Sequence, residues 1–219
     1  MNINVSAADH LLTTTRGVRR RMDFDRPVAP EIIEECIEIA LQSPVGSLTT
    51  KRHFIVVTDP EKRRQVADVY GKACYPYLEE REQKATELGD DPQAELIRRN
   101  LGLAKYQADR MADHPVLIIL ALEGRVEKED VMSQASFYGS ILPAAWSLML
   151  ALRARRLGSC WTTLHLMYEE DAAKALGMPE NVTQAVLLTV AYYTGTDFKP
   201  SRHLPAREQT HWNTWGRHR

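Results

Sequence analysis

The sequence predicts a single α+β or mixed α/β domain in which helices surround two or three central strands. Two observations support this class: apolar runs rich in β-branched residues, typical of strands, and intervening segments whose apolar residues recur at helical spacing. The strands are expected at His53–Thr58, Val116–Leu122 and Ala185–Tyr193. A chain of 219 residues, of which 44% are hydrophobic, is long enough to bury a full core.

The first half of the chain is expected to hold an amphipathic helix, a strand and a second helix. Apolar side chains recur at helical spacing through Pro30–Gln42, and proline suits the first turn of that helix. After the first strand, Asp59 and Pro60 form a capping pair that predicts a helix over Glu61–Gly71. A short helix is expected earlier, over Asp9–Thr15.

The segment Tyr75–Met111 is charged and helical in character, with a break at Gly89–Pro92. Its many charges and few large apolar residues predict a helical excursion on the surface.

The second half of the chain is more apolar. The run Val116–Leu122 predicts a strand with both faces covered. A long helix is expected over Lys128–Arg156, followed by a turn and short strand over Leu157–Thr163 and a helix over Tyr168–Leu176. Residues 194–219 form a polar and aromatic tail without a core of its own.

Composition and charge argue against several classes of protein. The formal net charge of −1 argues against bulk nucleic-acid binding. The uncharged segment Val131–Leu152 is interrupted by serine, glycine and proline, so we expect a helix buried within the protein or a dimer, and no membrane span. The three cysteines, Cys36, Cys74 and Cys160, are widely spaced, and this sparse count together with the lack of a signal sequence favours a cytoplasmic location.

The sequence contains no motif for catalysis by side chains. It has no glycine-rich nucleotide loop, no nucleophile elbow and no pair of histidines at metal-binding spacing. Isolated histidines are more typical of surface or core positions than of metal sites, so we predict no metal and no catalytic side chain. An enzyme with this sequence would therefore take its difficult chemistry from a cofactor.

One segment near the N-terminus is strongly basic. Residues 13–27 read TTTRGVRRRMDFDRP, with five arginines against two aspartates. They indicate either a solvated, mixed-charge surface or a phosphate site, because a guanidinium donates two parallel hydrogen bonds to phosphate oxygens.

The order of several segments resembles the FMN-dependent nitroreductase family. The similar stretches are TRGVRRRMDFDRPV, QSPVGSLTTKRHFIVVTDPEKR, HPVLIILAL, RRLGSCWTT, GMPENVTQAVLLTVAYY and KPSRHLPAREQTHWNTW. The resemblance covers residues 13–215 and implies one nitroreductase-like FMN-binding domain, residues 1–219. Its α+β fold would have a central mixed or antiparallel sheet flanked by helices. It also implies a homodimer in which the C-terminal tails are exchanged, with the Val131–Leu152 helix at the interface and Trp212 and Trp215 as anchors on the neighbour.

The resemblance assigns the FMN phosphate and ribityl chain to two basic sets. Arg16 and Arg20 match the family's first arginine and the basic position four residues later, with Gly17 and Val18 between them. Lys199 and Arg202 resemble the second set. The sequence does not decide whether Arg19 and Arg21 face solvent or a partner subunit.

The rest of the flavin site is implied by two further segments. Pro44 and Ser47 match the family's loop, but Leu48 and Thr50 stand where an asparagine and a glutamine usually bind the pyrimidine edge of the flavin. The segment Thr162, Thr163 and Leu164 resembles the stretch whose backbone faces flavin N5.

The implied activity is the transfer of hydride from NAD(P)H through flavin N5 to an electron-poor acceptor such as a nitroaromatic or a quinone. Two alternatives stay open: a flavin-sequestering protein that is not an enzyme, and a dehalogenase-like flavoprotein with a substrate lid. In the second, residues 75–111 form the lid, with Tyr75, Tyr77, Lys105 and Tyr106 as substrate contacts. A plain surface hairpin is the other interpretation of that segment.

Overall fold

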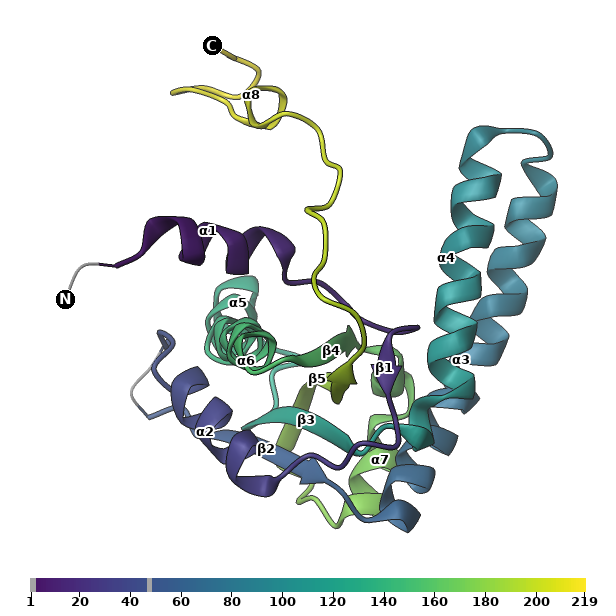
Figure 1. Cartoon of the computed structure of the whole chain (residues 1–219), viewed down its shortest axis with the longest axis vertical. Helices are drawn as coiled ribbons and strands as arrows, with labels where there is room; N and C mark the ends of the chain where they lie inside the picture. The colour runs from purple at the N-terminus through teal and green to yellow at the C-terminus, as the bar shows by residue number, and fades with distance from the viewer. Residues whose placement is uncertain (1–2, 47–48) are drawn as a thin grey trace. The chain divides into compact units, whose positions relative to one another are not determined.

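An antiparallel sheet lies at the centre of the computed structural model, which describes residues 3–46 and 49–219 (Figure 1). Among these residues the sheet has five strands: four follow the order β1-β5-β3-β2, and β4 also pairs with β5. The strands are β1 (Met22–Asp23), β2 (Arg52–Val57), β3 (Val116–Glu123), β4 (Leu157–Thr162) and β5 (Val182–Tyr193). The predicted strands are confirmed, and β1 is an addition, too short to leave a signal in the sequence.

Helices cover both faces of this sheet. Along β3, Ile118, Leu120 and Leu122 face α2 and α6, whereas Leu117 and Ile119 face α3, because successive side chains of a strand point to opposite faces. The predicted α+β class with helices flanking the sheet is therefore confirmed. The helices of this part are α2 (Pro30–Ala40), α3 (Pro60–Glu87), α4 (Pro92–Asp109), α5 (Val131–Gly139), α6 (Leu142–Ala154) and α7 (Glu169–Leu176), with short 3-10 turns η1 (Met111–Asp113) and η2 (Leu164–Tyr168).

The chain forms two compact units. Residues 16–195 make up the first, which we call the body. The second combines the described residues up to Thr15, including α1 (Val5–Thr14), with the tail from Thr196, which holds α8 (Ala206–Gln209). Within this second unit, His10 Nε2 lies 2.8 Å from Asp197 Oδ2 and joins α1 to the start of the tail.

The predicted long helix over residues 128–156 is wrong in one respect, because it is two helices, α5 and α6. Pro143 lies in the first turn of α6, where its missing N–H costs nothing, but within one continuous helix its ring would clash with the carbonyl of Gly139. Ser140, at the break, instead donates from Oγ to the carbonyl of Ser136 at 2.9 Å.

The two halves of this apolar segment differ in burial. By length and composition, residues 131–154 are the one stretch of the described chain that is apolar enough to cross a membrane. However, α6 buries Leu148 and Leu152 in the core against the sheet. In α5 no residue is buried, and Val131 and Met132 are 84% and 72% exposed.

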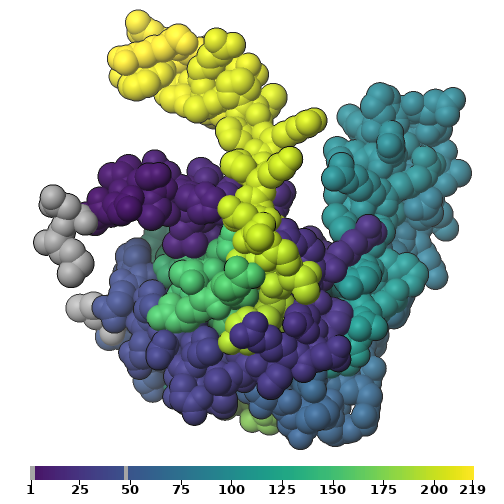
Figure 2. Space-filling model, viewed as in Figure 1, coloured from purple at the N-terminus to yellow at the C-terminus, as the bar shows by residue number. Residues whose placement is uncertain are grey.

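Helix α3 is much longer than predicted and forms a hairpin with α4. It runs past the expected end at Gly71 and through Pro76 to Glu87. Its buried residues gather between Val66 and Cys74, and beyond them the two helices pack mainly on each other. Figure 2 shows this hairpin projecting from the body. The predicted break at Gly89–Pro92 is confirmed.

Candidate functional site

The arginine-rich segment runs beside the free edge of β4. Gly17 forms a parallel bridge with Ser159, and the Val18 N–H donates to the Ser159 carbonyl at 2.8 Å. Glycine at position 158 permits this approach, because a Cβ there would lie only 3.0 Å from Val18 Cβ and 3.1 Å from Met22 Sδ. Val18 is buried, and its packing therefore fixes the backbone position of the neighbouring arginines.

The arginines of this segment lie in different environments. Arg16 and Arg20 are exposed, and Arg20 makes no hydrogen bond or ion pair with the residues that the structure describes. Arg21 is half-buried and donates from Nε to the Thr194 carbonyl at 2.7 Å. The Arg21 guanidinium therefore ties the segment to the end of β5.

Arg19 points toward the buried Cys160. Its side chain is half-buried, and its Nε is covered without a hydrogen-bond partner among the described residues. Burial raises the pKa of the Cys160 thiol, and the positive charge of Arg19 partly opposes this rise. A covered donor without a partner needs an explanation, such as a ligand or a water molecule.

The end of β4 is the second part of the site. Thr162 is half-buried, Thr163 is exposed and Leu164 begins η2. Thr162 Oγ1 donates to the Tyr70 hydroxyl on α3 at 3.2 Å. Gly17 lies beside Ser159, and Ser159 is three residues before Thr162 on β4. The fold therefore brings the arginine-rich segment and the predicted flavin-facing segment to the same strand.

The remaining predicted flavin contacts are distributed differently. Pro44 is exposed, and Ser47 and Leu48 lie outside the described residues. The loop before them is fixed by a hydrogen bond of 2.8 Å from the Gly46 N–H to Ser140 Oγ. Lys199 and Arg202 are exposed residues of the second unit.

These residues suit a cofactor that carries a phosphate. Arg16 and Arg20 offer exposed guanidiniums, and Arg19 adds a covered donor that no described residue satisfies. The described residues hold no group of three or more histidine, cysteine or acidic side chains that is placed to bind a metal ion. The site can therefore bind and orient an anionic cofactor.

Two of the four predicted substrate residues meet on the hairpin. The Tyr75 hydroxyl donates to Asp109 Oδ1 at 3.1 Å, and Lys105 Nζ lies 2.7 Å from Asp109 Oδ2. The hydrogen bond from Lys105 is the main reason why the pKa of Asp109 is lowered. Tyr77 lies under the guanidinium of Arg81 instead, and Tyr106 is half-buried on α4. Tyr75 and Asp109 also line a groove of about 540 Å³ between α3 and α4.

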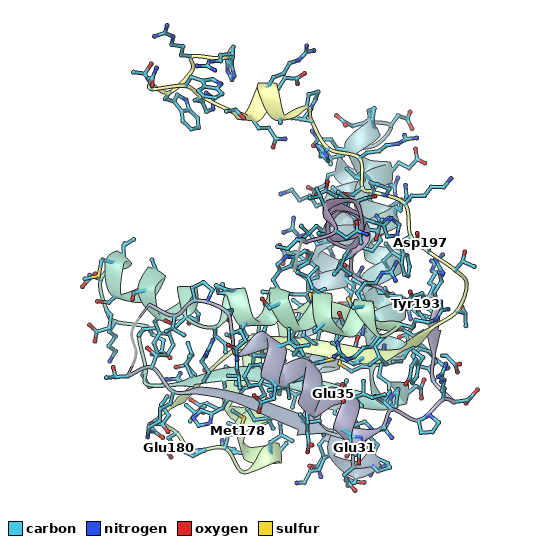
Figure 3. The ribbon with its side chains drawn as sticks, turned by 60° about the vertical axis from the view of Figure 1, so that its left-hand side comes forward. Glu31, Glu35, Met178, Glu180, Tyr193 and Asp197 are labelled. Carbon is cyan, nitrogen blue, oxygen red and sulfur yellow. The ribbon has the colours of Figure 1, made fainter. Side chains whose placement is uncertain are left out.

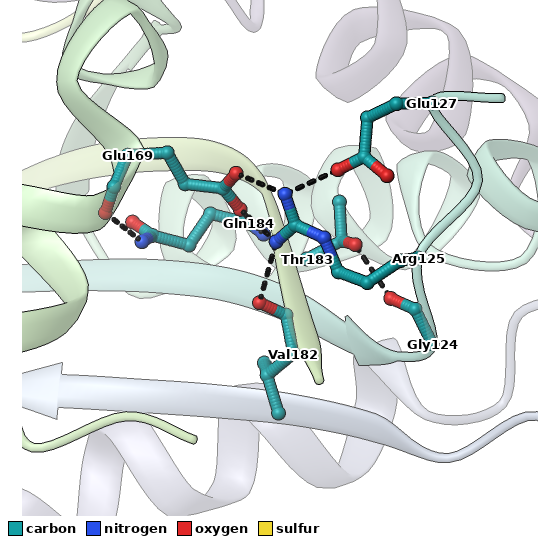
Figure 4. A network of polar contacts seen from close by, with 7 residues as sticks. All are labelled: Gly124, Arg125, Glu127, Glu169, Val182, Thr183 and Gln184. Atoms are coloured by element: carbon teal, nitrogen blue, oxygen red, sulfur yellow. Dashed lines mark hydrogen bonds and ion pairs between the residues drawn. The ribbon is translucent and has the colours of Figure 1, made fainter. Parts of the chain in front are cut away.

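A second polar cluster fixes the segment that follows Leu164 (Figure 4). The guanidinium of Arg125 binds both carboxylate oxygens of Glu169, at 3.2 and 2.9 Å, and the Val182 carbonyl at 3.2 Å. Glu169 also accepts from the backbone N–H of Gln184 at 2.7 Å. These contacts connect the start of α7, directly after η2, to the start of β5.

A cavity of about 520 Å³ opens beside this cluster, between α7 and the start of β5. Met178 and Glu180 line it, and Figure 3 shows them at the end of β5 opposite to Tyr193. Because β1 pairs with Tyr193, the arginine-rich segment belongs to that other end. The Arg125 cluster therefore supports the fold at one end of β5, and the arginine segment lies at the other.

Replacing Glu169 with alanine is expected to lower the free energy of unfolding by about 2–3 kcal/mol, because Arg125 and the Gln184 N–H lose a shared acceptor. Urea denaturation of the purified protein measures this change. Glu170→Ala is the matched control, since the side chain of Glu170 is 90% exposed and should change stability by less than about 0.5 kcal/mol. Equal losses in the two variants would contradict the role given to the cluster.

Sequence reasoning missed Tyr70 and the inward position of Arg19. A signal for Tyr70 exists, because Val66, Tyr70 and Cys74 recur at helical spacing and predict the buried face of α3. No comparable signal marks Arg19. Its direction follows from the bridge between Gly17 and Ser159, which joins residues far apart in the chain.

Known proteins share this fold. Iodotyrosine deiodinase from Drosophila melanogaster is 28% identical to this chain over 197 residues, which are 87% of this chain and 65% of that protein. A solved structure of iodotyrosine deiodinase bound to FMN and 3-iodo-L-tyrosine has a TM-score of 0.67 at 19% identity, covering 92% of this chain and 96% of the other.

Two further solved structures are similar. The FMN-dependent nitroreductase NfnB from Mycobacterium smegmatis, in complex with NADPH, gives a TM-score of 0.67 at 20% identity and covers 96% of this chain and 99% of its own. A nitroreductase-like protein from Bacillus cereus gives 0.65 at 16% identity, with coverages of 97% and 98%. At these identities the structures establish the fold. The model of the nitroreductase family itself matches residues 16–192, well over half of the sequence, and the chain belongs to the nitroreductase family.

Proposed function

We propose that this protein is an FMN-dependent oxidoreductase that passes hydride from NAD(P)H through flavin N5 to an electron-poor acceptor such as a nitroaromatic or a quinone. Family membership supports the cofactor and the reaction type. When bound, FMN supplies the centre that accepts and releases hydride. We expect the protein in the reducing cytoplasm, in keeping with its three free, buried cysteines.

The observation that carries this proposal is the arginine segment held against β4. Arg16 and Arg20 would bind the phosphate, with the covered Nε of Arg19 as a further donor. Gly17 and Val18 would present the backbone between them. The end of β4 and the following turn, from Thr162 to Leu164, would orient the flavin ring.

We further propose that the working form is a homodimer in which the tails are exchanged. The exposed Val131 and Met132 on α5 and the 89% exposed Trp215 in the tail support this, because exposed large apolar residues commonly mark interfaces. Lys199 and Arg202 in the tail would then complete a phosphate site. Sedimentation of the full chain would test the dimer, and a monomer at micromolar concentration would contradict it.

An absorbance spectrum tests the proposed function most directly. The purified protein, incubated with FMN and separated from free flavin, should be yellow, and anaerobic NADPH or NADH should bleach it. A colourless protein would contradict FMN binding. A yellow protein that neither nucleotide reduces would instead favour a flavin-sequestering role.

Reductive dehalogenation is a second candidate. The similarity to iodotyrosine deiodinase and the cluster of Tyr75, Asp109 and Lys105 on the hairpin support it. Such a cluster places a cation and an anion side by side, which suits a zwitterionic substrate held by residues 75–111 acting as a lid. In this reaction two electrons and a proton replace the halogen, which leaves as halide. Iodide release from 3-iodo-L-tyrosine by the reduced protein would establish it, and its absence alongside nitroaromatic reduction would favour the first candidate.

A further inference from the structure

Contacts link the end of β4 to α3, and α3 to α4. Thr162 Oγ1 donates to the Tyr70 hydroxyl at 3.2 Å. Cys74, one turn further along α3, belongs to the same buried cluster as Tyr70. The Cys74 thiol then contacts the carbonyl of Ala104 on α4 at 3.9 Å, within reach of a weak hydrogen bond to sulfur.

The residues at the centre of these contacts are buried. Tyr70 is 2% exposed and Cys74 is fully buried, and both belong to the core cluster that contains Leu117 and Leu187 of the sheet. Burial also raises the pKa of the Tyr70 hydroxyl, so the group stays protonated and keeps its donor. In such surroundings a polar group without its partner is costly, so the contacts are expected to persist together.

Thr162 lies where the core meets the candidate flavin site. It is the last residue of β4 and is half-buried, whereas Thr163 beside it is exposed. A threonine side chain has few rotamers, and a hydrogen bond from its hydroxyl selects one of them. The contact with Tyr70 therefore determines whether the hydroxyl or the methyl group of Thr162 points away from the core.

We propose that Tyr70 is a positioning residue that fixes the Thr162 side chain in the segment facing the flavin. The inference rests on the proposed function, because Thr162 acts on the flavin only if FMN binds beside β4. Since Tyr70 is held in the core cluster, the Thr162 hydroxyl stays directed toward α3, and this fixed orientation sets the electronic surroundings of the flavin ring.

The midpoint potential of bound FMN tests this coupling in a double-mutant cycle. Tyr70→Phe and Thr162→Val should each shift the potential in the same direction, and the double variant should shift it no further than the larger single change. Thr162→Ser keeps the hydroxyl and should restore the wild-type value. Tyr138→Phe, on α5, removes a half-buried tyrosine hydroxyl elsewhere and should leave the potential unchanged.

Hydrogen exchange of the FMN-free protein provides the second readout. In Tyr70→Phe the amides of residues 162–164 should exchange about threefold to tenfold faster, as expected for the loss of one hydrogen bond. The amides at the start of α7, held by Arg125 and Glu169, should keep their rates. If Tyr70→Phe does not fold, Thr162→Val compared with Thr162→Ser gives the same test from the other partner.

The outcomes separate the inference from the function on which it rests. A protein that binds no FMN contradicts the proposed function, while hydrogen exchange still reports whether Tyr70 holds Thr162. A protein that binds FMN but shows unchanged potentials in both single variants, or fully additive shifts, overturns the inference and leaves the proposed function intact. A loss of thermal stability without a change in potential assigns Tyr70 to the core alone and also overturns it.

Discussion

Replacing Arg16 with alanine is expected to weaken FMN binding by about tenfold to a hundredfold, because a hydrogen bond to a charged group contributes about 1.5–3 kcal/mol. Arg16 is exposed at the start of the segment that lies along β4, where its guanidinium would bind the phosphate. A titration of the FMN-free protein, followed by quenching of flavin fluorescence, gives the dissociation constant. Arg16→Lys should lie between the wild type and Arg16→Ala, since an ammonium keeps the charge but loses the planar fork.

A control within the same segment makes this result specific. The guanidinium of Arg26 lies over the ring of Tyr192, 3.5 Å from its centroid, and has no proposed role in binding. Arg26→Ala should therefore leave the affinity for FMN unchanged. The proposed dimer should persist in both variants. Unchanged affinity in Arg16→Ala, or an equal loss in Arg26→Ala, would show that the segment contributes only general positive charge.

Acidification from pH 7 to pH 5 is expected to cost the FMN-free protein about 4 kcal/mol of unfolding free energy, about 2 kcal/mol from each of two buried histidines. His165 is fully buried, with neither ring nitrogen hydrogen-bonded within the described residues, and burial lowers its pKa to about 4. Burial also lowers the pKa of His114 to about 4, in spite of hydrogen bonds to the carbonyls of Arg110 and Met111.

Proton binding explains why acid lowers the unfolding free energy. Between about pH 6.5 and pH 4 the unfolded chain binds protons at these histidines and the folded protein does not, so stability falls as the pH falls through this range. Urea denaturation at several pH values measures the slope. His165→Leu should roughly halve the loss, and at pH 7 it should be neutral or stabilising because two covered nitrogens without partners are removed.

His203→Leu is the control, since His203 lies exposed in the tail and should leave the slope as in the wild type. A slope that His165→Leu does not change would show that His165 is already charged or reached by water in the folded protein.

Local patterns in the sequence predicted those helices and strands that a short run of residues is enough to specify. The amphipathic repeat over Pro30–Gln42 and the apolar run over Val116–Leu122 lie where α2 and β3 are found. The break at Gly89–Pro92 was equally clear, because Asp91 caps α4 and Pro92 begins it. The order of these segments also identified the family, since its motifs are spread over most of the chain.

The same patterns misjudged where helices end. Gly71 was expected to end α3, but it is buried where the helix packs on the body, and packing outweighs the modest cost of an internal glycine. The break between α5 and α6 was missed because apolar composition continues across it, and only the proline geometry at residue 143 interrupts the backbone.

The sequence by itself determined the fold class and the family, because these depend on residue type and on the order of segments along the chain. Through the resemblance to that family it also picked Arg16 and Arg20 as candidates for a phosphate site. Only the tertiary structure decided which way the arginines point and what lies behind the site. Arg19 turns inward because Gly17 bridges Ser159, and Tyr70 reaches Thr162 because α3 packs across the sheet. Such contacts join residues up to 142 positions apart, as Gly17 and Ser159 are, and the free energy that selects them comes from packing that no local pattern encodes.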